Sequence, residues 1–226
     1  MDLHALAAAI DHTALKPNLP TEDIARLCEE AILHRFATVC VPPCYVRLAG
    51  SLLADSGIGV ATVIGFPLGY NTAAAKVAET VDALENGADE VDMVHNISLV
   101  KSGDFEDAVA EVREITQVVH AREKKVKVIL ETSYLSDEEI AECCRLYGAL
   151  GVDFVKTSTG FSDGGARAEI ISLMRQNLPE TVQIKASGGI RTATDALAML
   201  AAGATRLGCS ASVGILREAS HQTFGR

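Results

Sequence analysis

The segment "GVDFVK" at residues 151–156 recurs in similar form at two other places in the chain, and this recurrence indicates the fold. The related segments are "GADEVD" at 87–92 and "GATRLG" at 203–208. In each segment a glycine suited to ending a helix is followed by a run of strand-forming residues. The segments begin 64 and 52 residues apart, and each interval accommodates two strand–helix units. The chain is therefore expected to repeat a βα unit.

Short runs rich in Val and Ile alternate with amphipathic helical stretches along the whole sequence, a pattern typical of parallel sheets. Thr21 and Ser136 are expected to cap the helices that begin "TEDIARL" and "SDEEIAE". The predicted strands are residues 9–13, 37–41, 59–64, 89–94, 126–131, 152–157, 182–186 and 205–208. Eight strands with short connections and no linker predict an α/β protein, one (β/α)8 TIM barrel that forms a single domain over residues 1–226.

The bulk composition excludes several classes of protein. A formal charge of −10 opposes nonspecific binding to nucleic acid or to an anionic membrane. The first residues, "MDLHALAAAI", carry no basic region and no apolar run approaches the ~18 residues of a membrane span, so a cytoplasmic protein is expected. Six cysteines without a CxxC pair indicate no disulfide framework. Scattered histidines predict neither a metal site nor a cofactor.

Alternation along the strands predicts which side chains point toward the barrel axis. In strand 152–157, for example, Val155 faces the helices and Lys156 faces the axis. In a barrel of this kind, active sites lie at the carboxyl ends of the strands. The residues expected to converge on that mouth are Asp11, Asp92, Glu131, Lys156 and Lys185, and Cys40 points inward by the same count.

Two inward lysines beside an acid favour imine chemistry. A single strand-end Lys or Asp more often belongs to a structural ion pair, but three such groups on three strands favour catalysis. An amine attacks a carbonyl carbon only as the free base, and an ordinary lysine has a pKa of about 10.4. Burial and a second ammonium group both lower that pKa. We therefore expect Lys185 to help deprotonate Lys156, and Asp92 to relay protons with Lys185.

Glycines and small hydroxyl residues follow the last three predicted strands, at 157–165, 186–191 and 208–212. Backbone amides in such loops bind phosphate, and many barrels place a phosphate after strands seven and eight. Each loop alone is weak evidence because Gly and Ser are ordinary turn residues. Together with the lysines, the loops predict a metal-free Schiff-base barrel acting on a small phosphorylated carbonyl compound.

Five motifs, in their order and spacing, resemble the deoxyribose-phosphate aldolase (DeoC) family: "TVIGFPLG", "EVDMV", "KVILET", "VDFVKTSTGF" and "IKASGGIRT". The resemblance runs from "IDHTALKP" at 10–17 to "RLGCSAS" at 206–212. It implies reversible, metal-independent cleavage of 2-deoxy-D-ribose 5-phosphate to acetaldehyde and D-glyceraldehyde 3-phosphate, in the catabolism of deoxyribose phosphate.

The resemblance also implies roles for individual residues. The Schiff-base lysine falls on Lys156, the lysine that lowers its pKa on Lys185, and the proton-relay aspartate on Asp92. Cys40 falls near the substrate, as a small inward residue and not as a nucleophile. Phosphate contacts fall on Gly160, Gly188, Gly189, Gly208 and Ser210.

Three positions depart from the pattern of the family. They are "PPC" at 42–44, which ends in Cys44, then His95, and the loop "GCSAS", which contains Ala211. The departures raise the questions of what surrounds Cys40, whether His95 touches substrate, and whether Ala211 removes one hydroxyl contact to phosphate. One lost neutral hydrogen bond would weaken binding by about 0.5 to 1.5 kcal/mol.

Two other functions are compatible with parts of the sequence: a different lysine-dependent, phosphate-binding barrel enzyme, and a non-catalytic barrel that binds a phosphorylated metabolite. The retention of Lys156, Lys185 and Asp92 favours the aldolase over both. Small phosphorylated sugars and aldehydes are the expected partners, and self-association as a dimer is expected. Residues 121–127, "AREKKVK", are interpreted as a solvated helix end that runs into the strand at 126–131, and residues 217–226 as a tail that is frayed or folded over the site.

Overall fold

The computed structural model describes residues 2–224 and shows a closed barrel of eight parallel strands. Each strand pairs with its neighbours in chain order, and β8 closes the barrel against β1. The strands are β1 Ile10–Thr13, β2 Thr38–Val41, β3 Gly59–Ile64, β4 Glu90–Val94, β5 Lys125–Ile129, β6 Phe154–Lys156, β7 Gln183–Ser187 and β8 Arg206–Cys209. The (β/α)8 TIM barrel is confirmed, and the predicted strand ends lie within two residues of these bounds.

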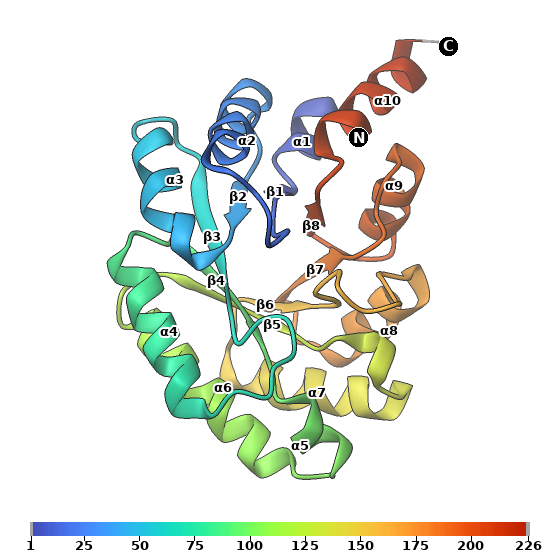
Figure 1. Cartoon of the computed structure of the whole chain (residues 1–226). Helices are drawn as coiled ribbons and strands as arrows, with labels where there is room; N and C mark the ends of the chain where they lie inside the picture. Colours follow the sequence, from blue (N-terminus) through green and yellow to red (C-terminus); the bar gives the residue numbers. More distant parts are fainter. Residues whose placement is uncertain (1, 225–226) are drawn as a thin grey trace.

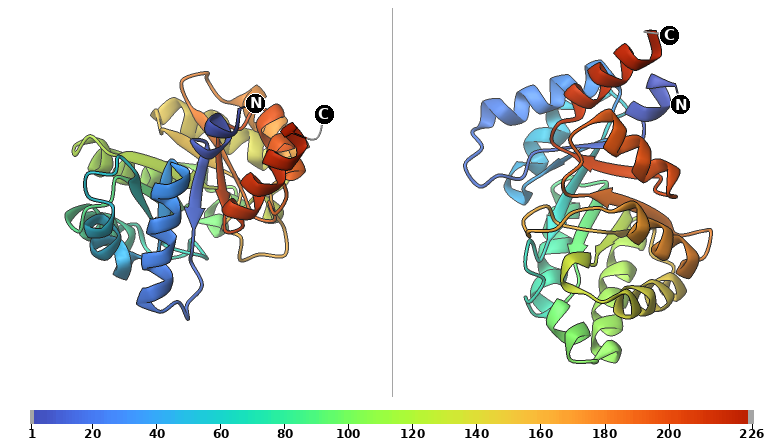
Figure 2. Two further views of the ribbon diagram at one scale, coloured as in Figure 1. Left: turned by 90° about the horizontal axis from the view of Figure 1, so that it is seen from above. Right: turned by 90° about the vertical axis from the view of Figure 1, so that its right-hand side faces the viewer.

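Helices surround the strands on the outside of the barrel (Figure 1). The α-helices are α1 Leu3–Ala7, α2 Thr21–His34, α3 Val46–Leu52, α4 Ala73–Glu85, α5 Ile97–Lys101, α6 Phe105–His120, α7 Asp137–Leu150, α8 Ala168–Asn177, α9 Ala193–Ala201 and α10 Ser212–Phe224, with 3-10 turns η1 Pro43–Tyr45 and η2 Thr132–Tyr134. Helices α1 and α10 pack against each other, as both views in Figure 2 show. Among residues 2–224, no helix combines the length and apolar character needed to cross a bilayer.

Helix α10 includes residues 217–224 of the tail, and residues 225–226 lie outside the described part of the chain. Residues 217–224 are therefore helical and not frayed, and the alternative of a tail folded over the site stays a prediction.

Of the two predicted helix caps, Ser136 is confirmed and Thr21 is wrong. Ser136 caps α7 as predicted: its hydroxyl accepts a hydrogen bond from the Glu139 amide at 3.2 Å, and the Glu139 carboxylate accepts one from the Ser136 amide at 2.7 Å. The prediction for Thr21 is wrong, because Pro20 is the N-cap residue of α2 and Thr21 is already helical. Pro20 has φ −78° and ψ 166°, so the extended backbone before the helix ends one residue earlier than expected.

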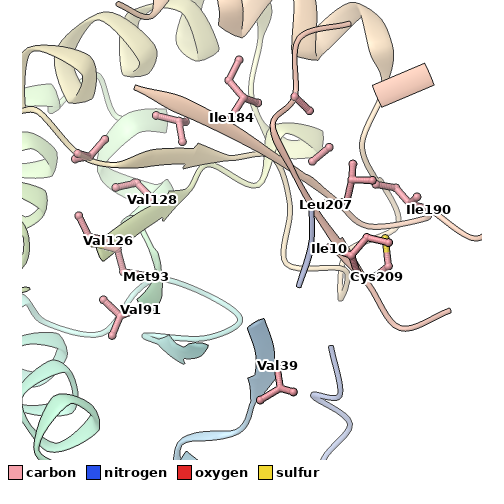
Figure 3. Close-up of a cluster of buried hydrophobic side chains, with 14 of the residues drawn as sticks. Ile10, Val39, Val91, Met93, Val126, Val128, Ile184, Ile190, Leu207 and Cys209 are labelled. Carbon is pink, nitrogen blue, oxygen red and sulfur yellow. The ribbon is translucent and has the colours of Figure 1, made fainter. Parts of the chain in front are cut away.

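The main hydrophobic core lies between the strands and the helices. Figure 3 shows outward-facing strand residues in this layer, including Val91 and Met93 of β4 and Val126 and Val128 of β5. The inside of the barrel is different, because its apolar part is small and contains Cys40, Ala61 and Val63. Charged side chains occupy much of the remaining interior and are fully or almost fully buried. The fold thus buries charge at its axis, which requires ion pairing.

We expect Ser136→Ala to lower the free energy of unfolding by about 1 kcal/mol, because the first turn of α7 loses its side-chain cap. Chemical denaturation would measure the change. Ser51→Ala, at an exposed position in α3, is the matched control and should leave stability within about 0.5 kcal/mol of the original. Equal stability of the two variants would contradict the role of the cap.

Candidate active site

The barrel interior holds a connected group of charged side chains, here named the barrel cluster. Its members come from β1, β4, β5, β6, β7 and β8, and each forms at least one ion pair within the group. The barrel cluster consists of Asp11, Glu90, Asp92, Lys127, Lys156, Lys185 and Arg206. Sequence alternation predicted four of these residues, namely Asp11, Asp92, Lys156 and Lys185.

Asp92 lies at the centre of the barrel cluster. One carboxylate oxygen accepts a hydrogen bond from Lys127 Nζ at 2.7 Å, and the other accepts bonds from Lys156 Nζ and Lys185 Nζ, both at 2.7 Å. Burial by itself would raise the pKa of Asp92, but the three neighbouring ammonium groups outweigh burial and hold that pKa well below its usual range. Asp92 therefore remains a carboxylate at neutral pH.

Lys127 forms ion pairs with three carboxylates, the third being Asp11 at 3.8 Å, and Lys185 forms ion pairs with two. Lys185 Nζ donates to Asp11 and to Asp92, and Lys127 Nζ lies 2.6 Å from a Glu90 oxygen and 2.7 Å from Asp92. Burial opposes the charged form of both lysines, yet their carboxylate partners raise both pKa values above the ordinary one. Both amines therefore stay protonated.

Lys156 differs from the other two lysines. Within residues 2–224, Asp92 is its one carboxylate partner, and Asp92 is shared with Lys127 and Lys185. Burial is the largest cause that lowers the pKa of Lys156; Asp92 opposes the shift and Lys185 reinforces it, and the net direction is downward. Lys156 is thus the amine of the barrel cluster that most readily becomes neutral.

A pocket of about 670 Å³ opens beside the carboxyl end of β6, and Lys156 lines it. Lys127 and Lys185, by contrast, have no exposed side-chain surface. The five residues predicted to contact phosphate also line this pocket: Gly160, Gly188, Gly189, Gly208 and Ser210. The pocket therefore brings the Lys156 amine, which most readily loses its proton, and the glycine loops to one surface.

Two of the glycines show why the loops need this residue. Gly188 has φ +87°, a left-handed conformation that L side chains rarely adopt. At Gly208, an added Cβ would lie 2.9 Å from the Ser187 Cβ and 3.1 Å from the Lys185 Cε. A side chain at either position would therefore strain the backbone or displace a neighbour, and glycine keeps the pocket wall close to Lys185.

Glu131 is buried behind the pocket and holds one of its loops. Its carboxylate accepts hydrogen bonds from the Thr159 amide at 3.2 Å, from the Thr159 hydroxyl, and from the Ser162 hydroxyl at 3.0 Å. Both partners belong to the loop between β6 and α8. Glu131 lies outside the barrel cluster and is a support for this loop.

Cys40 lies inside the barrel, with Ala61 and Val63 as its apolar neighbours. Burial raises the pKa of the Cys40 thiol to about 11. The thiol is therefore protonated at neutral pH, as expected for a small inward residue and not for a nucleophile.

The three residues that depart from the family pattern, Cys44, His95 and Ala211, do not line the pocket. His95 is fully buried: its Nδ1 lies 2.8 Å from the Tyr147 hydroxyl, and its Nε2 lies 2.9 Å from the Leu130 carbonyl. Cys44 is exposed within η1. Ser210 lines the pocket, whereas its neighbour Ala211 does not. His95 thus packs between strand and helix.

The interpretation of residues 121–127 as a solvated helix end that runs into β5 is confirmed for 121–125, but it missed Lys127 as an inward, buried residue. Lys125 is exposed at the start of β5, but Lys127 points into the barrel and is fully buried. The alternation that places Val126 and Val128 outside places Lys127 inside, so the signal was present in the sequence. Glu90 lies two residues before Asp92 and Arg206 lies two residues before Gly208. The same alternation therefore places both side chains inside the barrel.

Lys156 is a buried amine with a lowered pKa at the mouth of a closed barrel. A barrel aldolase needs such an amine to attack a carbonyl carbon, and the molecule falls in that class of enzyme. The model for the family described as "DeoC/LacD family aldolase" matches residues 5–217. The chain belongs to this family.

Known relatives agree with this assignment. A deoxyribose-phosphate aldolase of Thermoanaerobacter pseudethanolicus is 53% identical over 214 residues, covering 94% of this chain and 96% of the relative. The enzyme of that name from Bacillus subtilis is 50% identical over 213 residues, covering 94% and 95%. The solved deoxyribose phosphate aldolase of Aeropyrum pernix, described as tetrameric, is 32% identical with a TM-score of 0.92, covering 98% of this chain and 93% of its own.

The buried His95 leads to a prediction about stability and pH. Burial lowers the pKa of His95 from 6.5 to about 4 in the folded protein. Between these values the unfolded chain binds a proton that the folded protein does not, so stability falls as pH drops through this range, by about 3 kcal/mol in total. Denaturation at several pH values should show that His95→Gln loses this part of the pH dependence.

His4→Gln, at an exposed histidine, is the control and should keep the original dependence. An unchanged pH profile in His95→Gln would mean that the buried imidazole does not produce the effect.

Proposed function

We propose that this protein is a Schiff-base aldolase that reversibly cleaves 2-deoxy-D-ribose 5-phosphate to acetaldehyde and D-glyceraldehyde 3-phosphate, without a metal or another cofactor. The observation that carries the proposal is the position of Lys156, the buried amine with a lowered pKa that lines the same pocket as the glycine loops. The relatives that share about half of their residues with this chain carry the name of that activity.

In the first stage, the neutral Lys156 amine attacks the C1 aldehyde of the open-chain sugar and forms a carbinolamine. Loss of water then gives a protonated imine. Both steps move protons between nitrogen and oxygen, and Asp92 with Lys185 is placed to carry them, because Asp92 contacts both lysine amines at 2.7 Å. Lys185, protonated and buried, also favours the neutral form of Lys156.

In the second stage, the C3 hydroxyl loses its proton and the C2–C3 bond breaks. The electron pair of that bond moves toward the imine nitrogen, which accepts it as an enamine, and C3 leaves as the aldehyde of D-glyceraldehyde 3-phosphate. Protonation of the enamine at C2 and addition of water at C1 then release acetaldehyde and restore the Lys156 amine. Every proton taken up in the forward direction is returned, and the electron pair of the broken bond stays on the acetaldehyde fragment, so the cycle needs no oxidant or reductant and can run in reverse.

We assign the substrate phosphate to the glycine loops that line the pocket. The residues assigned to it are Gly160, Gly188, Gly189, Gly208 and Ser210. Helix α10 begins at Ser212, two residues after Ser210, and its N-terminal end adds a favourable dipole for an anion. Cys40 is assigned to the substrate end of the barrel interior, and Asp11 and Glu131 support the site from behind.

We extend the proposal to the whole protein: one aldolase domain over residues 1–226, a homodimer, in the cytoplasm. The domain assignment is supported by the family match over residues 5–217. Six free cysteines fit a reducing compartment. A net charge of −10 argues against nucleic acid or an anionic membrane as a partner. A non-catalytic binding barrel would have no need to retain Asp92, Lys156 and Lys185 in contact.

Borohydride added together with acetaldehyde should trap a reduced adduct on Lys156, because only a neutral amine forms an imine at neutral pH. Peptide mass spectrometry would locate the adduct. Exposed Lys125, on the same barrel, is an internal comparison and should be labelled far more slowly at pH 7. Recovery of unmodified Lys156 would contradict the imine mechanism.

Lys156→Ala should abolish cleavage of deoxyribose 5-phosphate, with a loss on the order of 10⁴-fold or more, while EDTA should leave the unmodified enzyme fully active. A coupled assay for D-glyceraldehyde 3-phosphate would measure both. Lys125→Ala is the control and should retain full activity. Strong inhibition by EDTA would indicate a metal-dependent aldolase instead.

A further inference from the structure

Two members of the barrel cluster, Arg206 and Glu90, do not line the pocket and do not touch Lys156. Arg206 Nη1 donates to the Asp11 carboxylate at 2.6 Å and to the Glu90 carboxylate at 3.1 Å. Glu90 in turn lies 2.6 Å from Lys127 Nζ. The guanidinium group also lies over the Phe154 ring, 5.2 Å from its centroid. The pair is thus fixed in place on the inner side of β4 and β8.

The barrel cluster holds four cationic side chains and three carboxylates. With every amine protonated, one positive charge is in excess in a region of low dielectric, where unbalanced charge is costly. Loss of a single proton makes the cluster neutral. The charge count therefore favours one neutral amine among the four cationic groups.

The contacts decide which group gives up this proton. Arg206 cannot lose a proton in a protein. Lys127 is ion-paired with three carboxylates and Lys185 with two. Lys156 has only a share of Asp92 among the described residues. The proton on Lys156 is therefore the most weakly held.

We propose that Arg206 and Glu90 are positioning residues that set the protonation state of Lys156 without touching it. Their two charges determine the net charge of the barrel cluster, and that net charge determines whether Lys156 keeps its proton. This inference rests on the proposed role of Lys156 as the nucleophile. Because Arg206 is positively charged, the barrel cluster carries one excess positive charge when Lys156 is protonated. The negative charge of Glu90, paired with Lys127, keeps this excess from being larger.

The other groups around Lys156 do not provide this adjustment. Cys40, on β2, is a neutral thiol, and Glu131 is engaged by the loop after β6. The side chains of β3 inside the barrel, Ala61 and Val63, are apolar. The charged groups of the barrel interior are Asp11 of β1, Glu90 and Asp92 of β4, Lys127 of β5, Lys185 of β7 and Arg206 of β8. On the pocket side, the charged side chains that line the same pocket as Lys156 are Lys16, Asp23, Arg26, Glu30 and Arg191. Changing Arg206 or Glu90 alters this balance without removing a direct contact of Lys156.

The test is the pH dependence of labelling at Lys156, measured with acetaldehyde and cyanoborohydride and read by peptide mass spectrometry. Arg206→Gln should move the midpoint upward by about one pH unit and slow labelling at pH 7 about tenfold, with recovery at higher pH. Glu90→Gln should move the midpoint downward. The double variant Arg206→Gln/Glu90→Gln should return it toward the original value, and Arg206→Lys, which keeps the charge, should stay near it.

Arg113→Gln makes the same change in net charge at an exposed position on α6, and its profile should match that of the original protein. An unmoved midpoint in folded Arg206→Gln, with normal labelling of the original protein, would overturn this inference and leave the proposed function intact. Failure of Lys156 in the original protein to label at all would overturn the proposed function instead.

If Arg206→Gln does not fold, as judged by circular dichroism, Glu90→Gln and the double variant decide. The inference then requires that the midpoint of labelling at Lys156 moves downward in Glu90→Gln and returns in the double variant. It fails if Glu90→Gln and the double variant have the same pH profile.

Discussion

The structure depends on one buried carboxylate that receives three lysine amines. Asp92 contacts Lys127, Lys156 and Lys185, each at 2.7 Å, in a barrel interior with almost no access to water. An unpaired charge there would cost several kcal/mol, so each amine needs the carboxylate and the carboxylate needs the amines. The arrangement forces the lysines close together, and closeness is what makes the proton on one of them easy to lose.

The (β/α)8 barrel supports this arrangement because its strands bring residues that are distant in sequence to one axis. Asp92 and Lys185 are 93 positions apart in the chain yet form a hydrogen bond. The helices and the outer faces of the strands carry the apolar core, which leaves the interior free for charge. The glycine loops at the carboxyl ends of β6, β7 and β8 then place the pocket against Lys156.

Much of this was accessible from sequence, for physical reasons. The βα repeat and strict alternation predicted the strands within two residues and placed Asp92, Lys156 and Lys185 inside the barrel. Lys127 was missed, because it was grouped with the four charged residues before it, 122–125, as part of a solvated helix end that runs into the strand. The environment of His95 could not be predicted, since its partners, Tyr147 and Leu130, come from elements that only the folded chain brings to it.

The sequence by itself determined the barrel, the inward direction of the lysines and the family, because periodicity and motif order are local properties of the chain. Tertiary structure decided why the pKa of Lys156 is lowered while those of Lys127 and Lys185 are raised. That outcome depends on how many carboxylates surround each amine: three for Lys127, two for Lys185 and a shared one for Lys156. Coulomb energies in a dry interior vary steeply with such distances, and distances between strands do not exist until the barrel closes.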